Sequence, residues 1–164
     1  MITHLPMYVN IVFILTTLLT VFLFYKAGSR SKISLGILVL WLLLQAVLSY
    51  VGFYTVTNTT PPRFILLALP AVLLIIYLFL TAKGRVYLNN LDAKTLTLLH
   101  VVRIPVELCL YWLFLHKSIR QLMSFEGRNF DILAGLTAPF IFYFGYVKNK
   151  LGKTVLLLWN FICL

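Results

Sequence analysis

Four residues that can do chemistry lie within one apolar stretch of the chain, TLTLLHVVRIPVELCLYWLFLH, at residues 95–116. They follow one another at spacings of three or four residues, so a helix places them on one face: His100, Arg103, Glu107 and Tyr111. Arg103 and Glu107 have the i, i+4 spacing at which a guanidinium and a carboxylate of one helix can meet. We expect them to form a buried pair that neutralises both charges. We call these four residues the candidate polar site.

Charged groups are costly in the middle of a helix that crosses a lipid bilayer. A central arginine or acid costs about 2.5 to 3.5 kcal/mol, whereas each leucine, isoleucine, valine or phenylalanine returns about 0.3 to 0.6 kcal/mol. Proline recurs near this depth in three successive apolar segments, as Pro70, Pro105 and Pro139, and we expect each to break its helix. Two interpretations are open: the prolines border a hydrated internal cavity, or they make static kinks.

Further polar residues lie in neighbouring segments. Gln45, at the centre of the second apolar segment, joins the candidate polar site either as a hydrogen bond between helices or as a ligand contact. Near the outer surface we expect a local cluster of Glu126, Arg128 and Asp131, in which Asp131 caps its helix. Arg103 lies about ten residues down an antiparallel helix, on the order of 15 Å from Asp131, so we do not expect these two to pair. Small residues on one face of the fifth segment predict close helix packing: Ala134, Gly135, Ala138 and Gly145.

The elements that position these residues are predicted to be transmembrane helices. The chain has 62% hydrophobic and 11% charged residues and a mean hydropathy of +0.98, unlike soluble domains. A hydrocarbon core of about 30 Å needs about 20 mostly apolar residues per helix. We therefore expect an all-α, polytopic transmembrane helix bundle in one domain over residues 1–164, with five full spans and a truncated sixth. The expected helices cover residues 5–25, 33–55, 62–82, 95–116, 129–147 and, in part, 154–164; a re-entrant or interfacial ending is the alternative for the last.

Basic residues, which give the chain a net charge of +10, gather in alternate segments between the predicted spans. This positive-inside pattern predicts a bacterial plasma (inner) membrane protein whose N-terminus lies outside the cytoplasm. It is not the pattern of a phosphate-binding face, so we expect no nucleic acid as a partner; the expected partners are the lipid bilayer and other proteins or a second copy of the chain. The basic residues on the cytoplasmic side are Lys26, Arg30, Lys32, Lys83, Arg85, Lys94, Lys148, Lys150 and Lys153.

Signatures of catalysis and of cofactor binding are missing from the sequence. It contains no Walker loop, H-E-x-x-H, G-x-S-x-G or C-x-x-C motif. Cys109 and Cys163 lie in apolar runs and offer neither a disulfide framework nor a metal-ligand spacing. Haem ligation by two histidines is not expected, because His100 and His116 share one helix. We expect no enzyme activity, no cofactor and no metal.

Three segments resemble a known but uncharacterised family of small multi-pass bacterial membrane proteins. They are HVVRIPVELCLYWLFLHK, SFEGRNFDILAGLTAPFIFYFGY and VLLLWNFICL, which include the motifs RIPVE and FEGRNFDILAGLTAP. The resemblance covers essentially the whole chain and implies that members continue with further apolar segments. It implies no activity, ligand or catalytic residue.

Three functions fit these features. The first is a non-catalytic membrane subunit or scaffold, in which the Arg103–Glu107 pair holds the helix register and segments 82–94 and 117–128 dock partners. The second is a proton-coupled or anion-binding transporter, in which Arg103 holds an anionic solute or the Glu107 carboxylate and Glu107 exchanges a proton. The third is an intramembrane enzyme with Glu107 or His100 as acid or base.

Overall fold

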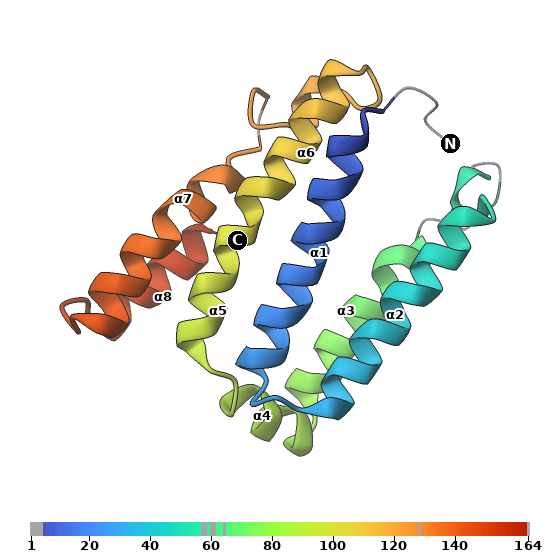
Figure 1. Ribbon diagram of the computed structural model, residues 1–164. Coiled ribbons are helices and arrows are strands. Elements are labelled where there is room, and N and C mark those ends of the chain that lie inside the picture. The colour runs from blue at the N-terminus through green and yellow to red at the C-terminus, as the bar shows by residue number, and fades with distance from the viewer. Residues whose placement is uncertain (1–4, 57–58, 60–61, 64, 128, 164) are drawn as a thin grey trace. The chain divides into compact units, whose positions relative to one another are not determined.

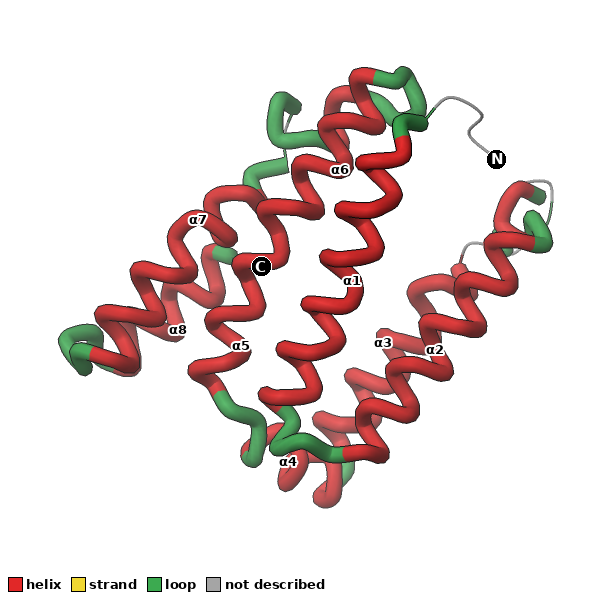
Figure 2. The backbone as a smooth tube through the Cα atoms, viewed as in Figure 1, coloured by secondary structure: helices red, strands yellow, loops and turns green. Residues whose placement is uncertain are grey.

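Helices form all the regular secondary structure of the described chain, which contains no strand (Figure 1, Figure 2). The computed structural model describes residues 5–56, 59, 62–63, 65–127 and 129–163. Two compact units divide the chain: Met1–Ala27 with Asp92–Leu164 form the first unit, and Gly28–Leu91 form the second. The helices are α1 (Met7–Ala27), α2 (Lys32–Tyr50), α3 (Ile65–Leu80), α4 (Ala82–Asn89), α5 (Ala93–Leu99), α6 (Arg103–Leu115), α7 (Asp131–Phe142) and α8 (Lys153–Ile162), with short 3₁₀ or π segments η1 (Phe53–Thr55), η2 (His100–Val102), η3 (Gln121–Met123) and η4 (Tyr143–Val147).

Three helices are long and apolar enough to cross a membrane. They are α1, α2 and the helix Ala93–Leu115, which α5, η2 and α6 form together. We call this last helix the α5–α6 span. These helices fit a membrane-embedded protein and correspond to the first, second and fourth predicted spans.

A bundle of five full spans is not confirmed. α3 has 16 residues and reaches the length of a span only together with α4, from which it is bent by 94°. The helices Asp131–Val147 and Lys153–Ile162 are both shorter than 18 residues. At 1.5 Å per residue, helices of this length cover less than the hydrocarbon core of about 30 Å.

In the first unit, α1 packs one face against the α5–α6 span. The buried hydroxyl of Thr16 donates to the carbonyl of Val12 at 2.7 Å, so it needs no partner outside its own helix. At the start of α1, the ring of Tyr8 meets the ring of Trp112 edge to face, with centroids 4.9 Å apart. The buried face of α1 consists of Val9, Thr16, Leu23 and Ala27.

The face of small residues on α7 packs closely, as predicted. Ala134, Gly135 and Ala138 are buried, and α7 lies against α5, η2 and α6. A Cβ on Gly135 would stand 2.7 Å from Cγ1 of Ile104 and 3.2 Å from the carbonyl oxygen of His100. Because the backbone of η2 comes so close, only glycine lets α7 approach at this position.

The prolines interrupt the helices less than predicted. α3 continues through Pro70 and α7 continues through Pro139. Beside Pro105, the α5–α6 span narrows to the 3₁₀ segment η2 and then resumes as α6. Proline lacks the N–H that would donate to the carbonyl of Val101, which accounts for irregular geometry in the turn before it.

In the second unit, the break in the helix falls at Thr81 and not at a proline. Thr81 has an extended backbone, and its hydroxyl accepts a hydrogen bond from the N–H of Gly84, which caps a new helix, α4. A Cβ at position 84 would lie 2.3 Å from the carbonyl oxygen of Leu78, so the bend requires glycine there. The prediction that 82–94 is a connecting loop is therefore wrong over Ala82–Asn89.

Candidate functional site

Arg103 stands where three helices of the first unit meet. Its Nη1 lies 2.8 Å from Oδ1 of Asp131, the first residue of α7, and 2.7 Å from the carbonyl oxygen of Cys163, directly after α8. An acid suits the N-terminus of a helix and a cation suits a C-terminus, so both charges also match the helix dipoles beside them. The side chains are 29% (Arg103) and 51% (Asp131) exposed, so the ion pair lies at the edge of the unit.

This ion pair corrects two predictions. Arg103 does not pair with Glu107, and Asp131 is not on the order of 15 Å away from Arg103. The prediction assumed that the fifth segment begins at the outer end of α6. Residues 116–127 instead return along α6, so that α7 begins beside η2, near the middle of the α5–α6 span (Figure 1).

Glu107 is the most deeply buried charged residue described, with 1% of its surface exposed. Its Oε1 accepts a hydrogen bond of 2.5 Å from Nδ2 of Asn129, while its buried Oε2 has no partner among the described residues. The N–H of Asp131 in turn donates to Oδ1 of Asn129 at 3.3 Å. Asn129 thus links the buried carboxyl group to the start of α7, and Oε2 is left able to hold a proton or accept another hydrogen bond.

His100 joins the site through an aromatic contact. Its ring lies 4.9 Å from the ring of Trp159 on α8, measured between centroids, and Nδ1 is buried without a partner among the described residues. Nε1 of Trp159 donates to Oγ1 of Thr137 on α7 at 3.0 Å. These contacts connect η2, α7 and α8 on the same side of the span as Arg103.

The C-terminal half of α6 carries Tyr111, whose ring lies 5.0 Å from Phe125 in the returning segment. The predicted outer cluster is wrong for Asp131, which pairs with Arg103. Glu126 is exposed and has no ion pair within the described ranges, and Arg128 lies outside them.

Gln45 belongs to the second unit. Its Oε1 accepts a hydrogen bond of 2.5 Å from the hydroxyl of Tyr54, which ties η1 to the end of α2. Its Nε2 is buried and has no partner in the described part of the chain. The structure thus gives Gln45 a local partner within its own unit.

Sequence reasoning missed the two groups that complete the site, the amide of Asn129 and the carbonyl of Cys163. Asn129 and Asp131 are the last polar residues before an apolar run, and an amide and an acid two residues apart complement a carboxyl and a guanidinium on a facing helix. The carbonyl of Cys163 left no such signal, because backbone groups look alike in every sequence. Among the described residues, no three His, Cys, Asp or Glu side chains are grouped for a metal ion.

The assembled site has one ion pair, one buried carboxyl group and the ends of two helices, all on one side of the α5–α6 span. Comparison of the chain with protein-family models, with curated proteins and with solved structures finds no match, so the resemblance of its RIPVE and FEGRNFDILAGLTAP segments stays a prediction.

Proposed function

We propose that this chain is a non-catalytic membrane subunit or scaffold whose polar site holds the hairpin of α7 and α8 against the α5–α6 span. The observation that carries the proposal is the position of Arg103, whose guanidinium binds the carboxylate of Asp131 and the carbonyl of Cys163. Both partners belong to the protein. An arginine engaged in this way links helices and is less available to a solute.

The energetics support this assignment. A central arginine costs about 2.5 to 3.5 kcal/mol in a lipid-spanning helix, and pairing with an acid at the start of α7 offsets part of that cost. Helices in lipid gain nothing from a hydrophobic effect between them, so polar contacts and close packing must hold them together. The site supplies polar contacts through Arg103 and close packing through Gly135.

The test of the subunit proposal combines assembly with activity. The chain is extracted in mild detergent, and its mass is measured by native mass spectrometry, with the expected result a homo-oligomer or a complex of fixed stoichiometry. A chain recovered alone at the mass of one copy would overturn the proposal. The double variant Arg103→Met with Asp131→Leu should keep any ion or proton flux of the wild-type chain in reconstituted vesicles, because neither group is assigned to transport.

A proton-coupled carrier is the second candidate, and the unpaired Oε2 of Glu107 favours it. A carboxyl group that is 1% exposed and has one free oxygen can exchange a proton between two conformations of the protein. Glu107→Gln keeps the shape and the acceptor for Asn129 but removes the exchangeable proton. Proton flux is measured in vesicles loaded with a pH-sensitive dye. If Glu107→Gln loses the flux of the wild-type chain and still folds, the carrier proposal replaces the subunit proposal. Equal flux, or none in either protein, would exclude the carrier.

We also propose a multi-pass arrangement in the bacterial plasma membrane with the N-terminus outside the cytoplasm, on the basis of the basic loops. Single cysteines at Ser29 and Ser118 test it with a membrane-impermeant maleimide on intact cells. Ser118→Cys should react and Ser29→Cys should not, and the reverse result would invert the topology. The unmodified chain, with Cys109 and Cys163 buried, is the background control.

A further inference from the structure

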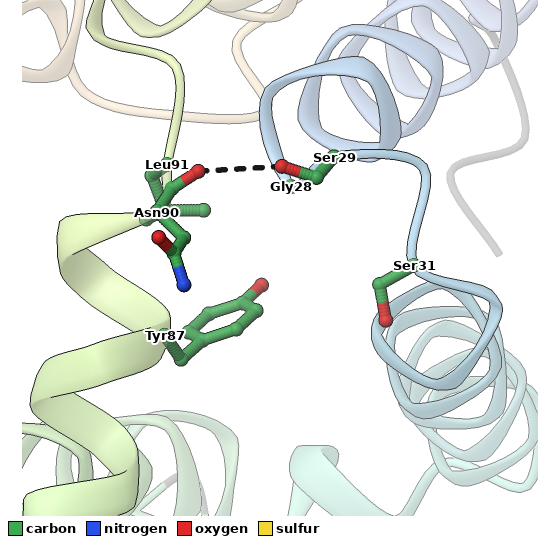
Figure 3. A pocket seen from close by; sticks show the side chains of 6 residues that line it. All are labelled: Gly28, Ser29, Ser31, Tyr87, Asn90 and Leu91. Atoms are coloured by element: carbon green, nitrogen blue, oxygen red, sulfur yellow. Dashed lines mark hydrogen bonds between the residues drawn. The ribbon is translucent and has the colours of Figure 1, made fainter.

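The second unit contains a pocket of its own. It is a cavity of about 320 Å³, at the small end of ligand pockets, between the segment before α2 and the end of α4 (Figure 3). The hydroxyl of Ser29 donates to the carbonyl of Asn90 at 3.3 Å and joins the two walls. The lining residues are Gly28, Ser29, Ser31, Tyr87, Asn90 and Leu91.

The walls of this pocket offer hydrogen-bond donors. The hydroxyl of Tyr87 points into the space between the two walls, and the amide of Asn90 lies beside it (Figure 3). Neither side chain has a hydrogen-bond partner among the described residues. The oxygen of Ser31 accepts from the N–H of Ser34, which leaves its O–H free to donate. The rest of the lining is largely apolar, so these donors match an acceptor-rich group, such as a phosphate, on a molecule with an apolar body.

The charges of the second unit point to an anion. Residues 28–91 contain five basic residues and no aspartate or glutamate, and four of the five lie on the two segments that form the pocket: Arg30 and Lys32 before and at the start of α2, and Lys83 and Arg85 on α4. The next acid along the chain, Asp92, uses both carboxylate oxygens to cap α5. No carboxylate of this unit can neutralise these cations, so they are free to attract an anion from outside it.

The bend between α3 and α4 sets the depth of the pocket. α3 has no charged residue, so we expect the helix to lie within the hydrocarbon core of the bilayer. α4, which carries Lys83 and Arg85, is turned 94° from it. With α3 across the membrane, α4 would run along the membrane surface. Tyrosine side chains such as Tyr87 favour this level, which is also the level of lipid phosphates.

We propose that this pocket binds a phosphate group, and that the headgroup of an anionic phospholipid presents it. Tyr87, Asn90 and Ser31 donate to the phosphate oxygens, and Arg30 and Lys32 supply the positive field. This proposal does not rest on the candidate polar site around Arg103 or on the function proposed for that site.

The test uses the full chain in detergent and titrates phosphatidylglycerol, with diacylglycerol as the lipid that lacks a phosphate, while native mass spectrometry counts bound lipid. Arg30→Gln with Lys32→Gln should weaken phosphatidylglycerol binding about 25-fold, since a cation about 4 Å from a bound phosphate strengthens its binding about fivefold in water. Tyr87→Phe should weaken it about fivefold, the effect of one hydrogen bond. Two matched controls, Lys148→Gln with Lys150→Gln and Tyr77→Phe, should stay within about twofold of the wild type.

If the pocket variants and the matched controls lose the same amount of phosphatidylglycerol binding, the proposed binding site is wrong, because general surface charge then attracts the lipid. If diacylglycerol binds as well as phosphatidylglycerol, the pocket does not recognise the phosphate group. Calorimetry with inorganic phosphate separates the two sources. Binding of inorganic phosphate that Tyr87→Phe abolishes, together with lipid binding that it leaves unchanged, would overturn the lipid as the source.

Discussion

The two units of this chain differ in their acidic residues. All four acidic residues, Asp92, Glu107, Glu126 and Asp131, belong to the first unit, where Asp131 pairs with Arg103 and Asp92 caps α5. The second unit has only basic residues and closes its polar contacts with neutral groups, such as Tyr54 on Gln45. Both units carry a net charge of +5, from nine basic and four acidic residues in the first and five basic residues in the second, so they differ in that only the first unit has acids to pair with its cations. The lack of any acid in the second unit, and not a larger net charge, indicates where an anionic ligand belongs.

The largest expected effect comes from removing one member of the ion pair. Asp131→Leu leaves Arg103 without its acid, and we expect a loss of about 2 kcal/mol in unfolding free energy, below the full cost of an unpaired central arginine because the pair is partly exposed. Adding Arg103→Met should restore most of it. Denaturant titration in micelles measures both. Arg85→Met in the second unit should change stability by less than about 0.5 kcal/mol, and an equal loss there would break the contrast between the units.

The next effect concerns the buried carboxyl group. Asn129→Leu removes the donor to Oε1 of Glu107, and leaving a buried acceptor unpaired costs about 1 to 3 kcal/mol. The same measurement on Tyr54→Phe, which removes the donor to the half-buried Gln45, should show a smaller loss. If the two variants lose the same unfolding free energy, deeper burial of the acceptor in the first unit does not increase the cost of removing its donor.

Glycine packing gives a third test. Gly135→Ala forces a methyl group against Ile104 and the backbone of His100, for which we expect a loss of about 1 to 2 kcal/mol. Gly36→Ala on α2 meets nothing within 4 Å and should be neutral or slightly stabilising, because alanine favours a helix. Thermal unfolding of the two variants side by side checks the prediction, which a loss for Gly36→Ala would contradict.

The smallest effect is a pH dependence at the cap of α5. The hydroxyl of Thr95 and the N–H groups of Lys94 and Thr95 hold the pKa of Asp92 below its ordinary value. Because the pKa is lower in the folded state, this contribution is present above the unfolded pKa and is lost as pH falls through the folded one. Asp92→Asn keeps a capping side chain and should flatten stability in that acid range. An unchanged pH profile would show that the cap adds no pH dependence. Ser31→Ala removes the uncharged cap of α2 and should shift stability by about 1 kcal/mol at every pH.

Part of the candidate site could be predicted from the sequence. Arg103 and Glu107 stood out because each is a costly residue in an apolar helix, and the packing face around Gly135 stood out because small residues recur at helical spacing. The pairing of Arg103 could not be predicted in the same way. The sequence contains an acid four residues from Arg103 and an acid on another helix, and nothing in the pattern of residues shows which of the two pairs with Arg103.

The sequence by itself determined the membrane-embedded class, the helical content and the positions of the long apolar helices, because hydrophobicity summed over about 20 residues is a local property. Only the tertiary structure decided that Asp131, and not Glu107, pairs with Arg103. That choice depends on where α7 begins, and residues 116–127 set this by returning along α6, where Phe125 contacts Tyr111. Likewise, only the tertiary structure shows that residues 28–31 and 87–91 of the second unit line one pocket, with α4 bent by 94° from α3.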